Sequence, residues 1–252
     1  ASSTAREIGD EPSQIKRKYP SVTVAVDGHR RRGMRRLLAL PEAERPQVVV
    51  LDDAFQHRYV RPSLSILVTD SHRLFTRDRL LPVGTLREPR SGVRRADMVV
   101  VTKCDPAMKP IESRIIEDEL RIDISRPRFF TSIAYRRLEG VWPEECPARE
   151  LSSLGSDTDV LLIAGIADPS PLIEELRRHT EQVVALTFPD HHTFHRTDID
   201  KIRAALKKQR PETLILCTEK DAERLRTTPL FPAEWHARTY ALPIEATFLF
   251  GA

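Results

Sequence analysis

Short apolar runs that end on polar residues recur along this chain, and segments with helical spacing lie between them. The runs lie at residues 21–26, 47–51, 64–70 and 96–103, and three more follow residues 158, 181 and 212. Because parallel strands need a crossover between them, this alternation is typical of a sheet covered by helices. We therefore predict an α/β fold with a mostly parallel sheet flanked by helices.

The pattern breaks in the middle of the chain. Residues 128–145 have the composition of an extended, aromatic stretch, and the Pro-, Glu- and Ser-containing residues after it are typical of a linker. A second series of strands and helices follows. We predict a core at residues 1–127, an extended linker at residues 128–156 and a smaller α/β lobe at residues 157–252.

Composition excludes several classes of protein. Of the 252 residues, 40% are hydrophobic and 31% are charged, which indicates a globular chain and not a disordered one. The 3 cysteines lie far apart, which argues against a disulfide framework or a zinc cluster. The chain also lacks an apolar run near the ~20 residues of a membrane-spanning helix.

The stretch VVVLDD, residues 48–53, resembles the Walker-B arrangement, in which an aspartate after an apolar strand holds Mg²⁺. Acidic residues also cap strand ends, so the pattern alone leaves a structural role open. The phosphate-binding loop GxxxxGK[ST] is not in this sequence. Either the nucleotide-binding interpretation is wrong or the loop precedes residue 1, in which case we expect this chain to be incomplete for activity.

Three further stretches carry candidate chemistry. Arg87 and Glu88 of LREP could stabilise a phosphoryl group and join a metal site, or form a surface ion pair. FPDHHTFH, residues 188–195, places a carboxylate beside imidazoles, which suits acid/base work or a capped turn. GDEP, residues 9–12, could begin a helix with acids on its dipole, or supply a base.

Basic side chains cluster in HRRRGMRR, residues 29–36. This run suits phosphates or an anionic surface, although a solvated helix face has the same composition. The stretch VTKCD, residues 101–105, is similar to the TKxD element with which GTPases read guanine.

Taken in order, these stretches resemble the tetraacyldisaccharide 4′-kinase (lipid A 4′-kinase) family of Gram-negative bacteria, in its Bacteroidetes branch. The resemblance rests on GDEP, VVLDDAFQHR, RLLPVGTLREP, RADMVVVTK, IAGIADP, FPDHH and TEKDAERL. It implies a P-loop-NTPase-like fold with a second, smaller α/β lobe. It also implies transfer of the ATP γ-phosphate, with Mg²⁺, to the 4′-hydroxyl of an acylated glucosamine disaccharide 1-phosphate.

The resemblance implies a role for each site residue. Asp10 would be the base, with His191 as its partner, although the choice between His191 and His192 stays open. Arg87 would stabilise the transferred group. The remaining roles are Mg²⁺ binding for Asp52, Asp53 and Glu88, phosphate binding for Gln56 and His57, and secondary catalytic roles for Glu11 and Asp190.

The resemblance also implies a peripheral enzyme on the cytoplasmic face of the inner membrane, and we expect a monomer that binds no nucleic acid. Two alternatives remain. One is another P-loop NTPase of the GTPase type, and the other is a non-catalytic fragment that binds an anionic glycolipid.

Overall fold

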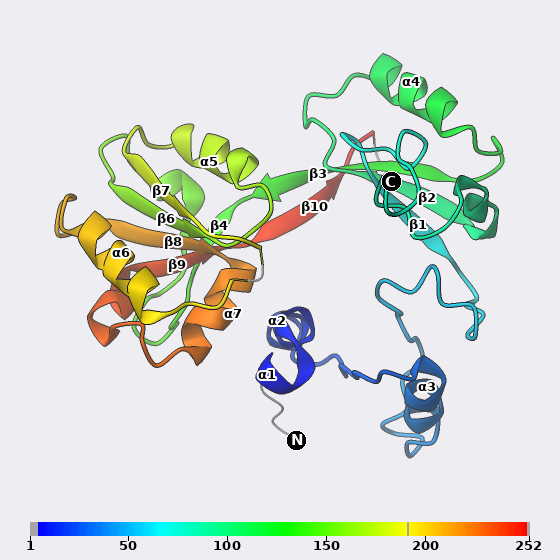
Figure 1. Ribbon diagram of the computed structural model, residues 1–252, viewed down its shortest axis with the longest axis horizontal. Coiled ribbons are helices and arrows are strands. Elements are labelled where there is room, and N and C mark those ends of the chain that lie inside the picture. The colour runs from blue at the N-terminus through cyan, green and yellow to red at the C-terminus, as the bar shows by residue number, and fades with distance from the viewer. Residues whose placement is uncertain (1–4, 191, 251–252) are drawn as a thin grey trace. The chain divides into compact units, whose positions relative to one another are not determined.

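The computed structural model describes residues 5–190 and 192–250 (Figure 1). The chain forms two compact units. Unit 1 comprises the residues up to Val26 and Tyr135–Ile244, and unit 2 comprises Asp27–Ala134 and the residues from Glu245 onward. The domain boundaries predicted at residues 127 and 157 remain a prediction. The contacts within the chain group the N-terminal segment with residues of the second half.

Unit 1 is built on a six-stranded sheet of order β5-β4-β9-β8-β6-β7. Its strands are β4 (Arg137–Gly140), β5 (Arg149–Glu150), β6 (Val160–Ala164), β7 (Val183–Thr187), β8 (Leu214–Thr218) and β9 (Thr239–Leu242). The strands from β9 to β7 are parallel, whereas β4 pairs antiparallel with β5 and β9. All five residues of β6 are buried, as its continuous apolar sequence predicts for a central parallel strand.

Helices cover both faces of this sheet. Alternate residues of β6 and β8 enter two separate core clusters. One cluster includes buried side chains of α6 (Arg196–Leu206) and α7 (Glu219–Thr227), and the other includes those of α5 (Ser170–Arg177). Two N-terminal helices, α1 (Ala5–Ile8) and α2 (Asp10–Lys18), contact α7, and short 3-10 turns lie at η2 (Leu151–Ser153) and η3 (Ala233–Arg238).

Unit 2 has a four-stranded sheet of order β1-β2-β3-β10. Its strands are β1 (Ile66–Asp70), β2 (Met98–Thr102), β3 (Arg128–Tyr135) and β10 (Ile244–Phe248), and β1, β2 and β3 run parallel. A core cluster joins β2 and β3 to α4 (Pro110–Leu120). The unit also contains α3 (Arg30–Leu38) and the 3-10 helix η1 (Arg90–Arg95).

The prediction of an α/β protein with mostly parallel sheets flanked by helices is confirmed. Strands form at β1 and β2, where residues 64–70 and 96–103 predict them, and at β6, β7 and β8 in the second half. The basic run HRRRGMRR forms α3, and GDEP begins α2.

The strands predicted at residues 21–26 and 47–51 are wrong. Both segments are irregular, and the side chains of Val48 and Val50 are 77% and 86% exposed. Valine-rich sequence favours an extended backbone, but a strand is stable only when its N–H and C=O groups pair with a neighbour. Among the described residues, neither segment pairs with a strand.

Across residues 5–190 and 192–250, no helix combines the length and the apolar character needed to cross a bilayer.

The N-terminus of α6 is closed by a capping box. The carboxylate of Asp198 accepts a hydrogen bond from the His195 backbone N–H at 3.0 Å, and it also binds His192 Nε2 at 2.8 Å and Lys201 Nζ at 3.1 Å. Burial raises the pKa of Asp198, but these hydrogen bonds outweigh burial and lower the pKa to about 2.

Replacement Asp198→Asn should therefore destabilise the protein in a pH-dependent manner. A lowered carboxyl pKa stabilises the fold above its unfolded value of 3.8, and this stabilisation is lost as pH falls towards about 2. We expect the variant to lose about 1–2 kcal/mol of unfolding free energy at pH 7, and the loss to shrink below about pH 4. Urea unfolding at several pH values measures this.

The matched control is Asp200→Asn, two residues further along the same helix, where the side chain is exposed. A deficit in Asp198→Asn that stays constant from pH 7 to pH 3 would contradict the role assigned to the ionised carboxylate.

Candidate active site

The start of α2 presents two acidic side chains. Asp10 and Glu11 occupy its first turn, where the helix dipole favours negative charge, and Lys16, Arg17 and Lys18 occupy its last turn. Gly9 precedes the helix with φ of 95°, a backbone conformation that costs little only for glycine. The sequence GDEP therefore begins a helix and places the Asp10 carboxylate at its N-terminus.

The carboxylate of Asp221 lies buried at the start of α7. The Thr218 hydroxyl donates a hydrogen bond to Asp221 Oδ2 at 2.7 Å, and the Gly165 backbone N–H donates one to the same oxygen at 2.9 Å. The guanidinium of Arg224 pairs with Asp221 Oδ1 at 3.1 Å. Burial raises the pKa of the Asp221 carboxyl. The hydrogen bonds and the charge of Arg224 lower this pKa, but burial outweighs them.

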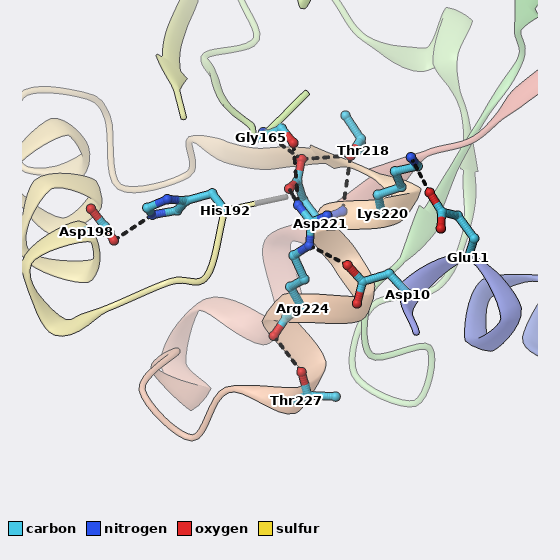
Figure 2. Close-up of polar contacts among 10 residues, drawn as sticks. All are labelled: Asp10, Glu11, Gly165, His192, Asp198, Thr218, Lys220, Asp221, Arg224 and Thr227. Atoms are coloured by element: carbon cyan, nitrogen blue, oxygen red, sulfur yellow. Dashed lines mark hydrogen bonds and ion pairs between the residues drawn. The ribbon is translucent and has the colours of Figure 1, made fainter. Parts of the chain in front are cut away.

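Arg224 connects this buried group to α2. Its Nε lies 2.9 Å from Asp10 Oδ2, while its Nη1 faces Asp221 and the carbonyl oxygen of Gly165 (Figure 2). The Arg224 side chain is only 9% exposed. The candidate base Asp10 is thus paired with a cation that a buried carboxylate holds in place.

Further ion pairs attach α2 to α7. Glu11 binds Lys220 at 2.8 Å, Arg17 binds Glu223 at 2.6 Å, and the pair Lys18–Glu219 lies at 3.1 Å. No residue of α2 is buried. The attachment of α2 to α7 therefore depends on charge more than on apolar packing.

The DHH segment was predicted to supply an imidazole to Asp10. His191, the predicted partner, lies outside the described residues. Nε2 of its neighbour His192 binds Asp198 at 2.8 Å, and the His192 ring stacks on Phe188 with centroids 4.9 Å apart. His192 thus supports α6, and Asp190 lies exposed before it.

The DDAFQHR segment of unit 2 forms a turn. Arg30 of α3 donates to the carbonyl oxygens of Asp52 and Asp53 at 3.1 and 3.2 Å. Asp53 has φ of 44°, in the left-handed region that aspartate tolerates better than most residues. Its carboxylate pairs with Arg87 at 2.7 Å, so the predicted metal ligand and the predicted phosphate-stabilising arginine neutralise each other.

Glu88 is likewise surrounded by cations. Its carboxylate binds Arg95 at 2.6 Å and Arg58 at 3.3 Å, and Gln56 Nε2 lies 3.4 Å away. Burial raises the pKa of Glu88, but the hydrogen bonds from the two arginines outweigh it and lower the pKa. The predicted phosphate-side residue His57 has a buried Nδ1 that lacks a hydrogen-bond partner among the described residues.

Two of the three predicted metal ligands are engaged with arginine in this arrangement. Asp53 and Glu88 are each paired with arginine, and among the described residues there is no group of three His, Cys, Asp or Glu side chains placed to hold an ion. In the stretch VTKCD, Lys103 pairs with Asp70 at 2.7 Å, and Asp105 caps a turn by accepting a hydrogen bond from the Ala107 N–H.

The sequence places Gly165 and Asp221 just past the ends of apolar strands, where a ligand cleft is expected, but it assigns neither a role and does not single out Arg224. Gly165 has a steric reason to be glycine, because a Cβ at that position would lie 2.7 Å from Asp221 Oδ1. The signal available beforehand was the position of Gly165 and Asp221 after apolar strands.

Replacement Gly165→Ala should destabilise unit 1 by about 1–3 kcal/mol, because the new methyl group must displace a buried carboxylate held by Thr218 and Arg224. Thermal or urea unfolding measures the effect. Gly28→Ala is the matched control, since a Cβ there would meet nothing within 4 Å. Equal stability of the two variants would show that the Gly165–Asp221 contact is not constrained as described.

The chain matches the family described as "Tetraacyldisaccharide-1-P 4'-kinase" over residues 1–251. Curated relatives named tetraacyldisaccharide 4′-kinase include that of Parabacteroides distasonis, which is 54% identical over 98% of this chain and 67% of the relative. The relative of Bacteroides thetaiotaomicron is 47% identical over 98% of this chain and 67% of its own length.

A more distant relative, from Flavobacterium johnsoniae, is 39% identical over 98% of this chain and 68% of its own length. No solved structure matches the chain. Because the family match spans nearly all of the sequence, the chain belongs to the tetraacyldisaccharide-1-P 4′-kinase family.

Proposed function

We propose that this protein transfers the γ-phosphate of ATP to the 4′-hydroxyl of tetraacyldisaccharide 1-phosphate, in the biosynthesis of lipid A. The observation that carries the proposal is the family match over residues 1–251, and Asp10 at the N-terminus of α2 supports it. The GTPase-type alternative has less support, since Lys103 and Asp105 of VTKCD are engaged within their own unit.

Asp10 acts as the base in this proposal. It accepts the proton of the 4′-hydroxyl as the hydroxyl oxygen attacks the γ-phosphorus and the bond to ADP breaks. An aspartate is a weak base near neutral pH, so a partner imidazole that shares the proton would assist. We assign that partner to His191, because Nε2 of His192 is already bound to Asp198. Glu11 and Asp190 remain secondary candidates.

We also propose a fold of the P-loop type for the nucleotide-binding part of the protein. Arg87 would stabilise charge on the transferred group, and Gln56 and His57 would line the phosphates. The prediction that Asp52, Asp53 and Glu88 bind Mg²⁺ stays a prediction, and it requires that Arg87 and Arg95 release their carboxylates.

The first test uses the full-length protein with ATP and the lipid acceptor, and it follows ADP release and the phosphorylated product. We expect Asp10→Asn to lower kcat at least a hundredfold with little change in the KM for ATP, because the loss affects proton transfer and not nucleotide binding. A wild-type protein that forms no product would refute the kinase assignment, and an unimpaired Asp10→Asn would remove this residue as the base.

We also propose that the amphipathic helix α3 binds an anionic membrane surface, at the cytoplasmic face of the inner membrane. Arg32 binds Asp27 at 2.7 Å and Arg30 binds the DD turn, so these two arginines have structural roles. Arg31 and Arg35 lie one turn apart and are exposed, and Leu38 is exposed beside them. A basic helix of this kind binds negatively charged lipid.

The double charge reversal Arg31→Glu, Arg35→Glu should weaken binding to vesicles that contain anionic lipid by at least tenfold, since each arginine near such a surface contributes about 1 kcal/mol. Sedimentation with vesicles measures this. The control Arg114→Glu, Arg177→Glu changes the net charge equally at exposed positions on α4 and α5. Equal loss in both variants would mean that net charge matters and α3 does not.

A further inference from the structure

The guanidinium of Arg224 is shared between two carboxylates through different nitrogen atoms. Nε binds Asp10 Oδ2 at 2.9 Å, and Nη1 binds Asp221 Oδ1 at 3.1 Å and the Gly165 carbonyl oxygen at 3.4 Å. A planar guanidinium bound at two edges has a fixed orientation. The direction in which Nε points at Asp10 is therefore set by the contacts on its other side.

Asp221 supplies the fixed side of this arrangement. Its side chain is fully buried, and it is held by Thr218 and by the Gly165 N–H. Thr218 is also the N-cap of α7 and accepts the Asp221 N–H at 3.1 Å. The carboxylate is thus tied to the end of β8, to the turn after β6 and to the first turn of α7 (Figure 2).

Apolar packing does not fix the position of Asp10. No residue of α2 is buried, and the pairs of Glu11 and Arg17 with α7 hold the helix without touching the Asp10 carboxylate. Among the described residues, the contact that restricts rotation of the Asp10 side chain is its pair with Arg224. That contact occupies Oδ2, so the second carboxylate oxygen, Oδ1, can face an acceptor hydroxyl.

We propose that Arg224, anchored by Asp221, is the positioning residue of the catalytic base. It holds Asp10 in one rotamer with Oδ1 directed at the 4′-hydroxyl, and it does not itself contact the reacting atoms. The inference rests on the proposed kinase function, and it adds two residues to the machinery of the same reaction. A base held within a fraction of an ångström of its working geometry transfers protons faster than a freely rotating one.

The experiment is a double-mutant cycle in the full-length protein. Arg224→Gln, Asp10→Asn and the combined variant are assayed for kcat and for the KM of ATP, and thermal unfolding is recorded for each. Arg224→Gln should lower kcat about tenfold or more with the KM changed less than twofold. In the Asp10→Asn background the same replacement should slow the reaction less than twofold further, because there is no base left to orient.

Two companion variants keep the result interpretable if Arg224→Gln leaves the buried Asp221 unpaired and the protein unfolds. Arg224→Lys retains the charge but has a single nitrogen for two carboxylates, so it should restore stability and only part of kcat. The matched control is Arg210→Gln, since Arg210 pairs with the buried carboxylate of Asp159 at 3.1 Å in the loop before β8. It should lose stability while kcat is retained.

The outcomes distinguish the positioning role of Arg224 from the proposed kinase function. One outcome is that Arg224→Gln lowers kcat by the same factor in the wild-type and Asp10→Asn backgrounds; Arg224→Lys is used if Arg224→Gln does not fold. Arg224 would then act independently of Asp10, which overturns the inference while the kinase assignment stands. Full kcat in Arg224→Lys and in a folded Arg224→Gln would overturn it as well. A wild-type protein without kinase activity would overturn the proposed function, and the inference with it.

Discussion

The carboxylate of Asp221 is fully buried at the start of α7, and the contacts that make this burial tolerable connect the end of β8, the turn after β6, α7 and α2. A buried charge is costly unless it is paired and hydrogen-bonded. Thr218 and the Gly165 N–H supply hydrogen bonds, and Arg224 supplies the opposite charge. Arg224 also pairs with Asp10. The cation that neutralises the buried Asp221 therefore also contacts the carboxylate proposed as the catalytic base.

Charge replaces hydrophobic packing where α2 meets α7. The helix buries none of its residues, and its contacts with α7 include four ion pairs contributed by alternating acidic and basic positions of α7. Exposed ion pairs contribute little individually and are screened by salt. The pair of Arg224 with Asp10 has a nearly buried cation that Asp221 anchors, and the pair of Arg17 with Glu223 has a nearly buried anion, so these two are less screened than the other pairs.

Much of the fold was predictable from local pattern, and two segments were not. The central strand β6 is apolar throughout, and it is buried as predicted. Residues 21–26 and 47–51 have equally strong strand composition but remain irregular, because composition sets the preference of a backbone and not the presence of a partner. Of the two interpretations of GDEP, the helix start is confirmed, and its acidic residues suit the dipole.

The sequence by itself determined the family and the α/β class, because motifs and periodicities are local properties of the chain, and it suggested Asp10 as a candidate base. Only the tertiary structure decided which charges meet. It pairs Asp10 with Arg224, 214 positions away, and turns Asp53 and Glu88 towards arginines where the sequence pattern suggested a metal. An ion pair between distant residues follows no period in the sequence, since it depends on how helices and strands pack and on which buried charge must be neutralised.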